Sequence, residues 1–416
     1  MESNSAHMRI LVLNGGSSTI KASLYDVEGG TMSGAAQRPI WRVHGGWGNS
    51  NGTARIHAEG LGGVEEAELR IGAPGEVIEP ALGTLLKGQA QVLHAWTEIS
   101  AVGHRIVHGG SRLRESALIS EEVKSGISEA AEFAPEHNWF QLETIHTVER
   151  LLGPGIPQFA VFDTAFHASL PERAFVYGGP YEWLDRGIRR YGFHGISHQY
   201  VFGRAAEILG RDAAGLKLVS CHLGNGCSLA AIDGGKSVDT TMGFTPLDGL
   251  IMGTRAGSVD PGILIYLMQH GGYTADQLNW TLNKESGLKG LSGISGDMRE
   301  IMAAVEVGNR RAGLAFDAYI QRLCREIGGM VASLQGMDAL AFTAGVGENS
   351  APLREAVCKR FRYLGVEMDA ARNGDSPVDQ NIATPQSRVR VLVIRTDEEW
   401  QIARECVRLL PSSNRR

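Results

Sequence analysis

The chain has 416 residues, of which 54 are glycine, a share of about 13% against the usual share of roughly 7%. Its formal net charge of -6 argues against the basic stripe of a nucleic-acid-binding protein. No apolar run approaches the roughly 18 residues of a membrane span. We therefore expect a globular protein of two domains, with no nucleic-acid or membrane partner. Its five cysteines lack CxxC spacing, which favours free thiols and a cytoplasmic location.

Short apolar runs that alternate with helical patterns predict an α/β protein. Six runs predict buried strands: 9–13, 99–108, 157–162, 216–223, 338–344 and 389–394. The residues that follow them are, in order, NGGSS, GG, DTAFH, GNGC, GVGEN and TDEE. Because ligands of open α/β sheets bind at the carboxyl ends of strands, these segments predict one ligand cleft.

Helical periodicity predicts further elements in the second half of the chain, over about 299–335, 351–361 and 397–410. Asp297 and Glu300 have the spacing of a capping box at the first of these helices. In the first half, Asn138 with Gln141 indicates a capped helix start. Residues 29–88 contain 14 glycines and predict loops and short strands at the periphery of one domain.

Two segments about 210 residues apart share one pattern: 12–30 and 221–237. Each reads as an apolar strand, a turn of Asn, Gly and Ser, a second strand, and a turn with paired glycines. A duplicated glycine hairpin suits two related domains that grip a polyphosphate from opposite sides. Neither copy has the GxxxxGK[ST] spacing of a P-loop, which disfavours a Walker-type NTPase.

Several charged residues lie in glycine-rich surroundings at predicted strand ends. Arg105 and Arg255 are embedded in GHRIVHGG and GTRAGS, and guanidinium groups suit carboxylate and phosphoryl oxygens. Asp163 follows a predicted strand, where it could hold a metal, accept a proton or cap a helix. His194, between Phe193 and Gly195, is a candidate hydrogen-bond donor.

Nine strings resemble, in order, the signature segments of the acetate kinase family, within the superfamily of actin, hexokinase and the sugar kinases. They are LNGGSSTIK, GHRIVHGG, FDTAFH, RRYGFHGISH, HLGNG, SVDTTMGFTPLDGLIMGTRAG, GISGDMRE, GVGEN and TDEE. The resemblance runs from about residue 9 to 410, with 29–90 as the exception.

The resemblance implies a two-lobed α/β fold of duplicated ribonuclease-H-like, actin/hexokinase-like domains with an ATP cleft between them. The implied N-terminal lobe comprises 8–163 with 396–416, and the implied C-terminal lobe comprises 164–395 and mediates nucleotide binding and dimerisation. The implied reaction is the reversible, magnesium-dependent transfer of phosphoryl from ATP to acetate, giving acetyl phosphate and ADP. The implied assembly is a homodimer. The implied metal ion is Mg²⁺, which Mn²⁺ can replace.

Site roles also follow from the resemblance. The catalytic residues are Arg105, Asp163, His194 and Arg255, and the metal residues are Asn14 and Glu398. The substrate-binding residues are Arg105, Val107, His137, Phe193 and Pro246. The nucleotide-binding residues are Lys21, His222, Leu223, Gly224, Asn225, Gly226, Asp297, Met298, Arg299, Gly345, Val346, Gly347, Glu348 and Asn349.

A short-chain carboxylate is ionised at pH 7, so it needs no base to attack a phosphoryl group. Asp163 is therefore interpreted as an orienting group. Where the family has APLHNP this chain has APEHNW, with Glu136 in place of an apolar residue of the methyl pocket, so a propionate or butyrate kinase is the alternative. A sugar or glycerol kinase and a non-catalytic ATP-binding protein are the more distant alternatives.

Overall fold

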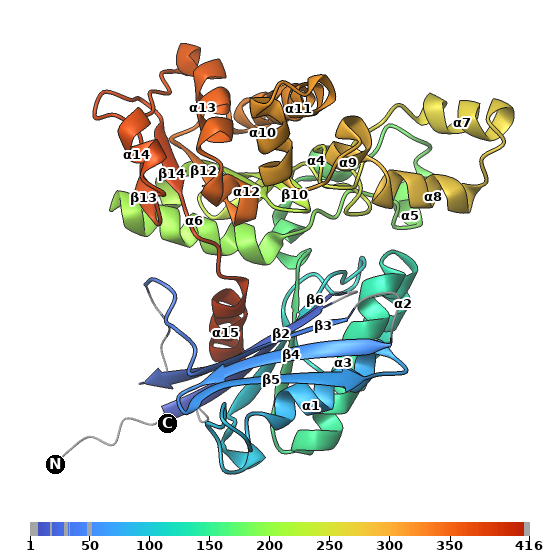
Figure 1. The fold of residues 1–416 in the computed structure, drawn as a ribbon, viewed down its shortest axis with the longest axis vertical. Coiled ribbons are helices and arrows are strands. Elements are labelled where there is room, and N and C mark those ends of the chain that lie inside the picture. The colour runs from blue at the N-terminus through green and yellow to red at the C-terminus, as the bar shows by residue number, and fades with distance from the viewer. Residues whose placement is uncertain (1–6, 17–18, 29–31, 33, 48–51, 412–416) are drawn as a thin grey trace. The chain divides into compact units, whose positions relative to one another are not determined.

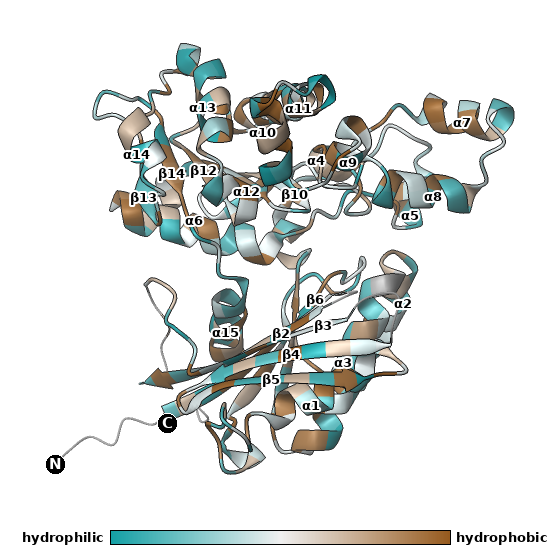
Figure 2. Ribbon diagram, viewed as in Figure 1, coloured by the Kyte–Doolittle hydropathy of each residue, from teal (hydrophilic) through white to brown (hydrophobic). Residues whose placement is uncertain are grey.

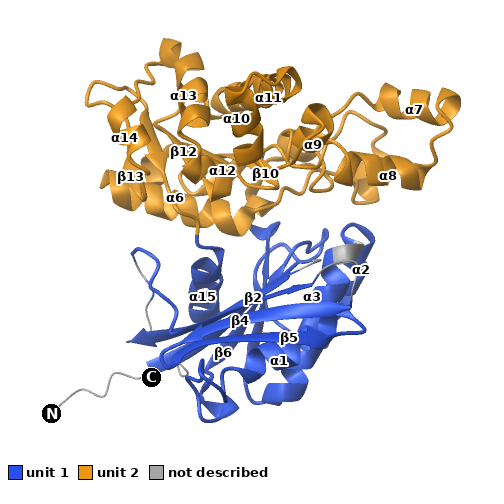
Figure 3. Cartoon of the chain, viewed as in Figure 1, with its two compact units in different colours: residues 1–165, 397–416 blue, residues 166–396 orange. Residues whose placement is uncertain are grey.

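The computed structural model describes residues 7–16, 19–28, 32, 34–47 and 52–411, without the side chains of residues 135 and 136. It divides into two compact units, shown in Figure 3. Unit 1 comprises Met1–Ala165 and Asp397–Arg416, and unit 2 comprises Phe166–Thr396. Among the described residues, no helix is long and apolar enough to cross a membrane.

In the described part of unit 1, eight strands form one sheet in the order β5-β4-β3-β2-β1-β6-β8-β7. Their bounds are β1 His7–Gly15, β2 Thr19–Glu28, β3 Trp41–Trp47, β4 Thr53–Gly60, β5 Gly63–Arg70, β6 Ala101–Ile106, β7 Ala117–Leu118 and β8 Gln158–Phe162. Strands β1 to β5 pair antiparallel, whereas β6 and β8 continue the sheet parallel to β1.

Helices of unit 1 cover both faces of this sheet (Figure 1). They are α1 Ile78–Gly83, α2 Glu121–Glu129, α3 Pro135–Leu152 and α15 Glu398–Leu409. On one face, Leu11 and Leu13 pack in a core cluster with residues of α1 and α3. On the other face α15 lies so close that a Cβ at Gly103 would be 2.6 Å from both Ile402 and Cys406. Only glycine allows this approach.

In the described part of unit 2, six strands form a sheet in the order β11-β10-β9-β12-β14-β13. Their bounds are β9 Lys217–Leu223, β10 Cys227–Asp233, β11 Lys236–Thr240, β12 Ala339–Thr343, β13 Gln380–Asn381 and β14 Arg390–Val393. The helices are α4 Glu172–Phe175, α5 Glu182–Asp185, α6 Gly195–Leu209, α7 Pro261–His270, α8 Ala275–Lys284, α9 Gly287–Ser292, α10 Met298–Glu306, α11 Arg310–Leu334, α12 Ala344–Asn349, α13 Ala351–Arg360 and α14 Ala370–Gly374.

The two sheets repeat one arrangement. The order β3-β2-β1-β6-β8 of unit 1 corresponds to β11-β10-β9-β12-β14 of unit 2. In each, three antiparallel strands precede two strands that run parallel to the first. The predicted duplication is confirmed, and the two glycine-turn hairpins are β1–β2 and β9–β10.

All six predicted strands are present, as β1, β6, β8, β9, β12 and β14. The helices expected over 299–335 are α10 and α11, and Asp297 caps α10 by accepting a hydrogen bond from the backbone N–H of Arg299. The expectation for residues 29–88 was wrong in part, because β3, β4 and β5 are regular strands of seven or eight residues. One of its glycines is required sterically, since a Cβ at Gly60 would lie 2.0 Å from the carbonyl oxygen of Ala90.

One local prediction was also wrong. Helix α3 begins at Pro135 with Ala134 as its N-cap, so Asn138 does not cap it. The GVGEN segment, which follows a predicted strand, forms the short helix α12 between β12 and α13.

Candidate active site

Three predicted residues lie at the carboxyl ends of adjacent parallel strands in unit 1. The register is given by two pairs: Val12 with Gly103, and Arg105 with Val161. Side chains alternate along a strand, so Asn14, Arg105 and Asp163 all face the side of the sheet that α15 covers. Glu398 is the first residue of α15. The strand register therefore brings these four side chains to one place.

Arg105 is the centre of this cluster, which we call the arginine cluster: Asn14, Arg105, Asp163 and Glu398. Its Nε and Nη2 donate to the Asp163 carboxylate, with Nη2 2.6 Å from Oδ2, and its Nη1 donates to Asn14 Oδ1 at 2.9 Å. The Asn14 amide donates to Glu398 Oε2 at 3.3 Å, and Arg105 Nη1 lies 3.7 Å from the same oxygen. The bidentate pairing of Arg105 with the Asp163 carboxylate fixes the plane of the guanidinium.

Burial makes this cluster electrostatically strong. The Asp163 side chain is 2% exposed and the Arg105 side chain 18%. Burial raises the pKa of Asp163, the Arg105 guanidinium opposes that rise, and Glu398 adds to it. Burial alone would lower the pKa of Arg105, but Asp163 and Glu398 together raise it, so the guanidinium stays charged. The cluster therefore presents a fixed cation next to amide and carboxylate oxygens.

Two buried amides of α3 hold the backbone beside this cluster. Gln141 accepts a hydrogen bond from the Val107 N–H at 3.0 Å and donates to the Gly15 carbonyl at 3.3 Å. Asn138 is fully buried and donates to the carbonyls of His108 and Ile127. Gln141 thus links the segments that follow β1 and β6, a role that its helix-start spacing did not predict.

The cluster also decides which metal would suit unit 1. Within the described ranges, no group of three or more His, Cys, Asp or Glu side chains could hold an ion. Asn14 and Glu398, however, are neighbours, since the Asn14 amide nitrogen lies 3.3 Å from Glu398 Oε2, and each side chain carries oxygen atoms. Mg²⁺ takes oxygen ligands, often only one or two from the protein, with water and phosphate completing its shell. The residues present therefore fit this ion.

In unit 2 the predicted nucleotide segments meet at the turn Gly224–Gly226, between β9 and β10. The Asn225 carbonyl accepts a hydrogen bond from Gly253, and a Cβ at Gly253 would lie 3.1 Å from the Gly296 carbonyl. On another side, a Cβ at Gly224 would lie 3.7 Å from Cβ of Ala344, the first residue of α12. The segments around 224, 253, 296 and 344 are therefore neighbours within unit 2.

Two histidine rings stand beside the same turn. His194 and His222 stack with centroids 4.2 Å apart and planes at 20°. His194 Nδ1 hydrogen-bonds with Ser228 Oγ at 2.9 Å, and His222 Nδ1 with Ser197 Oγ at 2.8 Å. A Cβ at Gly226 would lie 3.4 Å from Nε2 of His194, so the absence of a side chain there leaves room beside the ring.

Arg255 lies at this turn as well. Its Nη1 would be 3.6 Å from a Cβ at Gly226, and it donates to the Pro246 carbonyl at 3.4 Å. Phe193 is 1% exposed, and its carbonyl hydrogen-bonds with His167 Nε2. Arg255, His194 and Pro246 are thus brought together, with Phe193 next to His194 in the chain.

Backbone strain gathers at the same place. His194 has φ 55° and Ala344 has φ 63°, values that residues other than glycine rarely adopt. Both residues border the Gly224–Gly226 turn. Such strain persists only where the surrounding structure imposes it, which is common at functional sites.

Other predicted residues have simpler surroundings. Asp297 pairs with Arg299 at 2.6 Å, and this pairing lowers the pKa of Asp297 while the Arg299 side chain stays 89% exposed. Burial raises the pKa of Glu348, whose Oε1 accepts from the Thr396 N–H. The remaining predicted residues take these places: Lys21 exposed opposite Asn14 in β2, Val107 buried after β6, His137 half-buried in α3, Leu223 buried at the end of β9, Met298 buried in α10, and Gly345, Val346, Gly347 and Asn349 in α12.

Sequence reasoning missed a residue that supports α12. Arg354 of α13 is 1% exposed, and its Nη1 donates to the carbonyls of Gly347 and Glu348 at 2.9 and 2.7 Å. Its Nε donates to Asn373 Oδ1 at 2.7 Å. These bonds satisfy carbonyls at the end of α12, where a cation is favoured.

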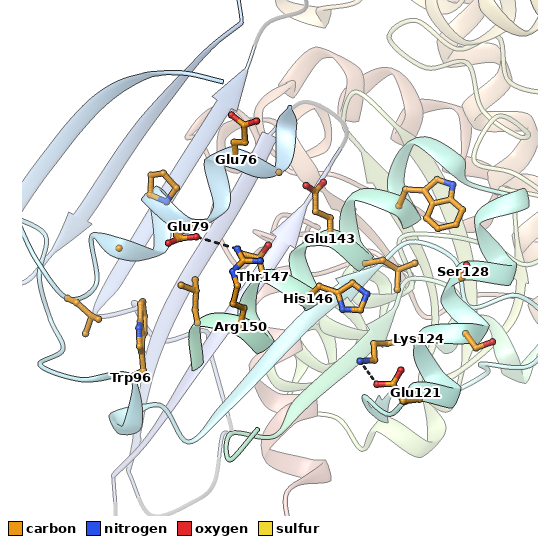
Figure 4. A pocket seen from close by; sticks show the side chains of 18 of the residues that line it. Glu76, Glu79, Trp96, Glu121, Lys124, Ser128, Glu143, His146, Thr147 and Arg150 are labelled. Atoms are coloured by element: carbon orange, nitrogen blue, oxygen red, sulfur yellow. Dashed lines mark hydrogen bonds and ion pairs between the residues drawn. The ribbon is translucent and has the colours of Figure 1, made fainter. Parts of the chain in front are cut away.

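A hollow of about 1300 Å³ in unit 1 is lined by α1, α2 and α3 (Figure 4). None of its lining residues is a predicted site residue. Two ion pairs lie in its lining, Glu79 with Arg150 and Glu121 with Lys124. The predicted site residues therefore lie outside the lining of this hollow.

Comparison with known proteins identifies first the fold and then the family. The fold is that of a crystallised acetate kinase from Porphyromonas gingivalis, 38% identical, with a TM-score of 0.89 over 97% of this chain and all of that one. A propionate kinase from Francisella tularensis is 34% identical, with a TM-score of 0.86 over 97% of this chain and all of that one. The duplicated sheets thus give this chain the α/β fold of these two carboxylate kinases.

The model of the acetokinase family matches residues 9–404, and the chain belongs to this family. An acetate kinase from Gloeobacter violaceus is 54% identical over 399 residues, covering 96% of this chain and 98% of the relative. An acetate kinase from Nostoc punctiforme is 51% identical over 404 residues, covering 97% of this chain and all of the relative.

Proposed function

We propose that this enzyme is an acetate kinase, which transfers the terminal phosphoryl group of ATP to acetate and forms acetyl phosphate and ADP reversibly. The observation that carries the proposal is the arginine cluster of unit 1, a charged guanidinium held in one plane by Asp163 and Asn14. Membership of the acetokinase family supports it further. A fixed guanidinium suits both the carboxylate substrate and the phosphoryl group that it receives.

The chemistry follows from the charges of the reactants. Acetate is ionised at neutral pH, so it attacks without a base, and the main obstacle is repulsion between two anions. In the proposed reaction Arg105, Arg255 and His194 offset the charge of the phosphoryl oxygens during in-line transfer. Asp163 does not remove a proton; it orients Arg105. The residues proposed to contact acetate are Val107, His137, Phe193 and Pro246.

Asn14 and Glu398 are proposed to hold Mg²⁺, or Mn²⁺ in its place, because their oxygens fit a hard cation. When bound, the ion supplies positive charge to the phosphate oxygens. Arg105 positions both residues, because its Nη1 donates to Asn14 Oδ1 and lies 3.7 Å from Glu398 Oε2.

The nucleotide is proposed to bind at the glycine turn of unit 2. The Gly224 N–H donates to the Gly226 carbonyl within the turn, so the N–H groups of Asn225 and Gly226 are the ones proposed to approach phosphate oxygens, beside two residues that carry no side chain. His222, Leu223, the Asp297–Arg299 segment and the Gly345–Asn349 segment are proposed to contact the nucleotide. Lys21 is proposed to add a positive charge near the phosphates.

A homodimer is also proposed, through the apolar surface of α7. This helix has no buried residue, and four of its apolar side chains are at least half exposed: Ile263, Ile265, Tyr266 and Met268. Figure 2 shows hydrophobic residues along α7. A second copy of the chain would cover this surface. The five free cysteines support the proposed cytoplasmic location, since thiols stay reduced there.

The test is formation of acyl phosphate, trapped with hydroxylamine, from ATP and a series of short carboxylates. The proposal expects acetate to give the highest kcat/KM, and no trapped product with any acid would overturn it. A preference for propionate would favour the alternative, as in the propionate kinase relative. The side chain of Glu136 lies outside the described residues, so Glu136→Leu with acetate and propionate tests its place in the pocket.

A further inference from the structure

A chain of hydrogen bonds runs behind the ring of His194. Ser228 Oγ lies 2.9 Å from His194 Nδ1 and 2.8 Å from His198 Nε2, and His198 Nδ1 lies 2.9 Å from Ser220 Oγ. Ser228, His198 and Ser220 are fully buried. We call these three residues the relay. It connects α6 with β10 and β9, and no role predicted above includes any of its members.

The orientation of the rings shows what the relay can control. His194 and His222 each turn Nδ1 toward a serine hydroxyl. Their Nε2 atoms lie toward the glycine turn, 3.4 Å from a Cβ built at Gly226 and 3.9 Å from one built at Gly224. A hydrogen bond to a ligand at this turn would therefore come from Nε2.

The stacking of the two rings limits their charge. Two imidazolium rings with centroids 4.2 Å apart would repel strongly, so at least one ring is neutral. A neutral imidazole carries its proton on one nitrogen and accepts at the other. For neutral His194 to donate from Nε2, its Nδ1 must accept a hydrogen bond.

The relay can supply that bond in only one direction. A serine hydroxyl has one proton, so Ser228 donates either to His194 or to His198. Complete burial keeps His198 neutral, because burial lowers its pKa well below the usual value. When Ser220 donates to His198 Nδ1, His198 donates from Nε2 to Ser228, and Ser228 donates to His194 Nδ1. The reverse direction would leave Nε2 of neutral His194 without a proton.

We propose that Ser228 and His198 are positioning residues that hold His194 in its Nε2–H tautomer, so that the ring donates from Nε2 beside the Gly224–Gly226 turn. This inference rests on the proposed function, in which a phosphoryl oxygen accepts that hydrogen bond. Neither residue contacts the substrate, and each acts through His194.

The chain contains its own reference for this tautomer. His167 Nε2 lies 3.0 Å from the Phe193 carbonyl oxygen, which can only accept, and His167 Nδ1 lies 2.8 Å from Ser237 Oγ. Burial lowers the pKa of His167 to about 4, so the ring is neutral at pH 7.5. Its proton is therefore on Nε2, and its two nitrogen signals calibrate the spectrum of His194.

The experiment is long-range proton–nitrogen NMR of the full chain labelled with ¹⁵N-histidine, at pH 7.5. Signals of His194 and His167 are assigned by their loss in His194→Gln and His167→Gln. Wild-type His194 should show a protonated Nε2 and an unprotonated Nδ1, like His167. In Ser228→Ala the Nδ1 signal should move toward the average of the two tautomers. The kcat for acetyl phosphate formation should fall about tenfold, with KM for ATP and acetate changed less than about twofold.

Two variants separate this role from a structural one. His198→Gln keeps an amide N–H that can reach Ser228, so it should retain most of the kcat, whereas His198→Leu should behave like Ser228→Ala. Ser237→Ala deletes a similar buried serine–histidine bond and is the matched control. It should shift the signals of His167 and leave those of His194 in place.

Three results would overturn the proposal. The first is a proton on Nδ1 of wild-type His194, alone or together with one on Nε2. The second is an unchanged tautomer in Ser228→Ala, even if the kcat falls. The third is an unchanged kcat. If Ser228→Ala does not fold, the wild-type spectrum and the pair of His198 variants still decide. Failure to form any acyl phosphate would refute the proposed function, while the wild-type spectrum would test the tautomer independently.

Discussion

Removal of the Arg105 side chain tests the arginine cluster most directly. Arg105→Ala would leave the Asp163 carboxylate, 2% exposed, without the cation that makes three hydrogen-bond contacts with it. Breaking a buried ion pair from one side costs about 3–5 kcal/mol, because the remaining charge is uncompensated. We therefore expect this loss in the free energy of unfolding, together with a fall in kcat of about 10³-fold or more.

The expected loss depends on pH in a defined direction. Burial already raises the pKa of Asp163, and without Arg105 to oppose it the pKa rises further. A carboxyl group whose pKa is raised by folding destabilises the folded state fully at pH values above its folded pKa, and this cost shrinks as the pH falls from that pKa toward the unfolded value. The stability deficit of Arg105→Ala should therefore be largest at pH 8 and shrink as the pH falls toward 5.

Two matched variants complete this test by calorimetry and the acetyl phosphate assay. Arg105→Ala with Asp163→Asn should recover most of the stability but none of the activity, because the buried charge is gone. Arg255→Ala, whose side chain donates to the Pro246 carbonyl at 3.4 Å, should lower kcat with a stability loss of about 1 kcal/mol. Equal stability losses in the two single arginine variants, or no recovery in the double variant, would refute the reasoning.

Three further predictions concern other parts of the chain. The pKa of His167 is lowered to about 4, so its contribution to stability is complete above pH 6.5 and falls by about 3 kcal/mol as the pH drops to 4. In His167→Asn the free energy of unfolding should therefore depend less on pH over this range. An unchanged dependence would contradict the lowered pKa. Gly103→Ala should lower the free energy of unfolding by about 1–3 kcal/mol, measured by thermal unfolding, because its Cβ would lie 2.6 Å from Cys406 Sγ. Adding Cys406→Ala should restore part of this loss, and no recovery would show that the contact is not the cause. Arg354→Met should raise KM for ATP about tenfold and leave KM for acetate unchanged, measured by steady-state kinetics, and equal changes in both would exclude a local effect on α12.

Strands were predictable where burial on both faces makes the whole segment apolar. Residues 9–13 and 389–394 are such segments, and they form the buried strands β1 and β14. Strands β3 to β5 were harder to predict, because buried residues alternate with more exposed ones along them and no continuous apolar run marks them. One face of an edge strand gives a weaker signal than two buried faces.

Side chains that act over long sequence distances were not predictable from local patterns. Asn138 is of a residue type that often caps helices, but its fully buried amide donates to carbonyls of two other segments. The contact between His198 and Ser228 depends on how α6 packs against β10, and nothing in either segment encodes the distance. The only local signal was the spacing of His194 and His198, four residues apart at the start of one helix.

The placement of α15 has a consequence for how the protein is made. Unit 1 needs Asp397–Arg416, yet the 231 residues of Phe166–Thr396 must be synthesised first, which takes on the order of 10 to 50 s. During this time the sheet face that contains Gly103 and Tyr25 lacks the helix that covers it, and Asn14 lacks Glu398. An unfinished chain therefore cannot assemble the proposed metal site before the last segment of unit 1 has been made.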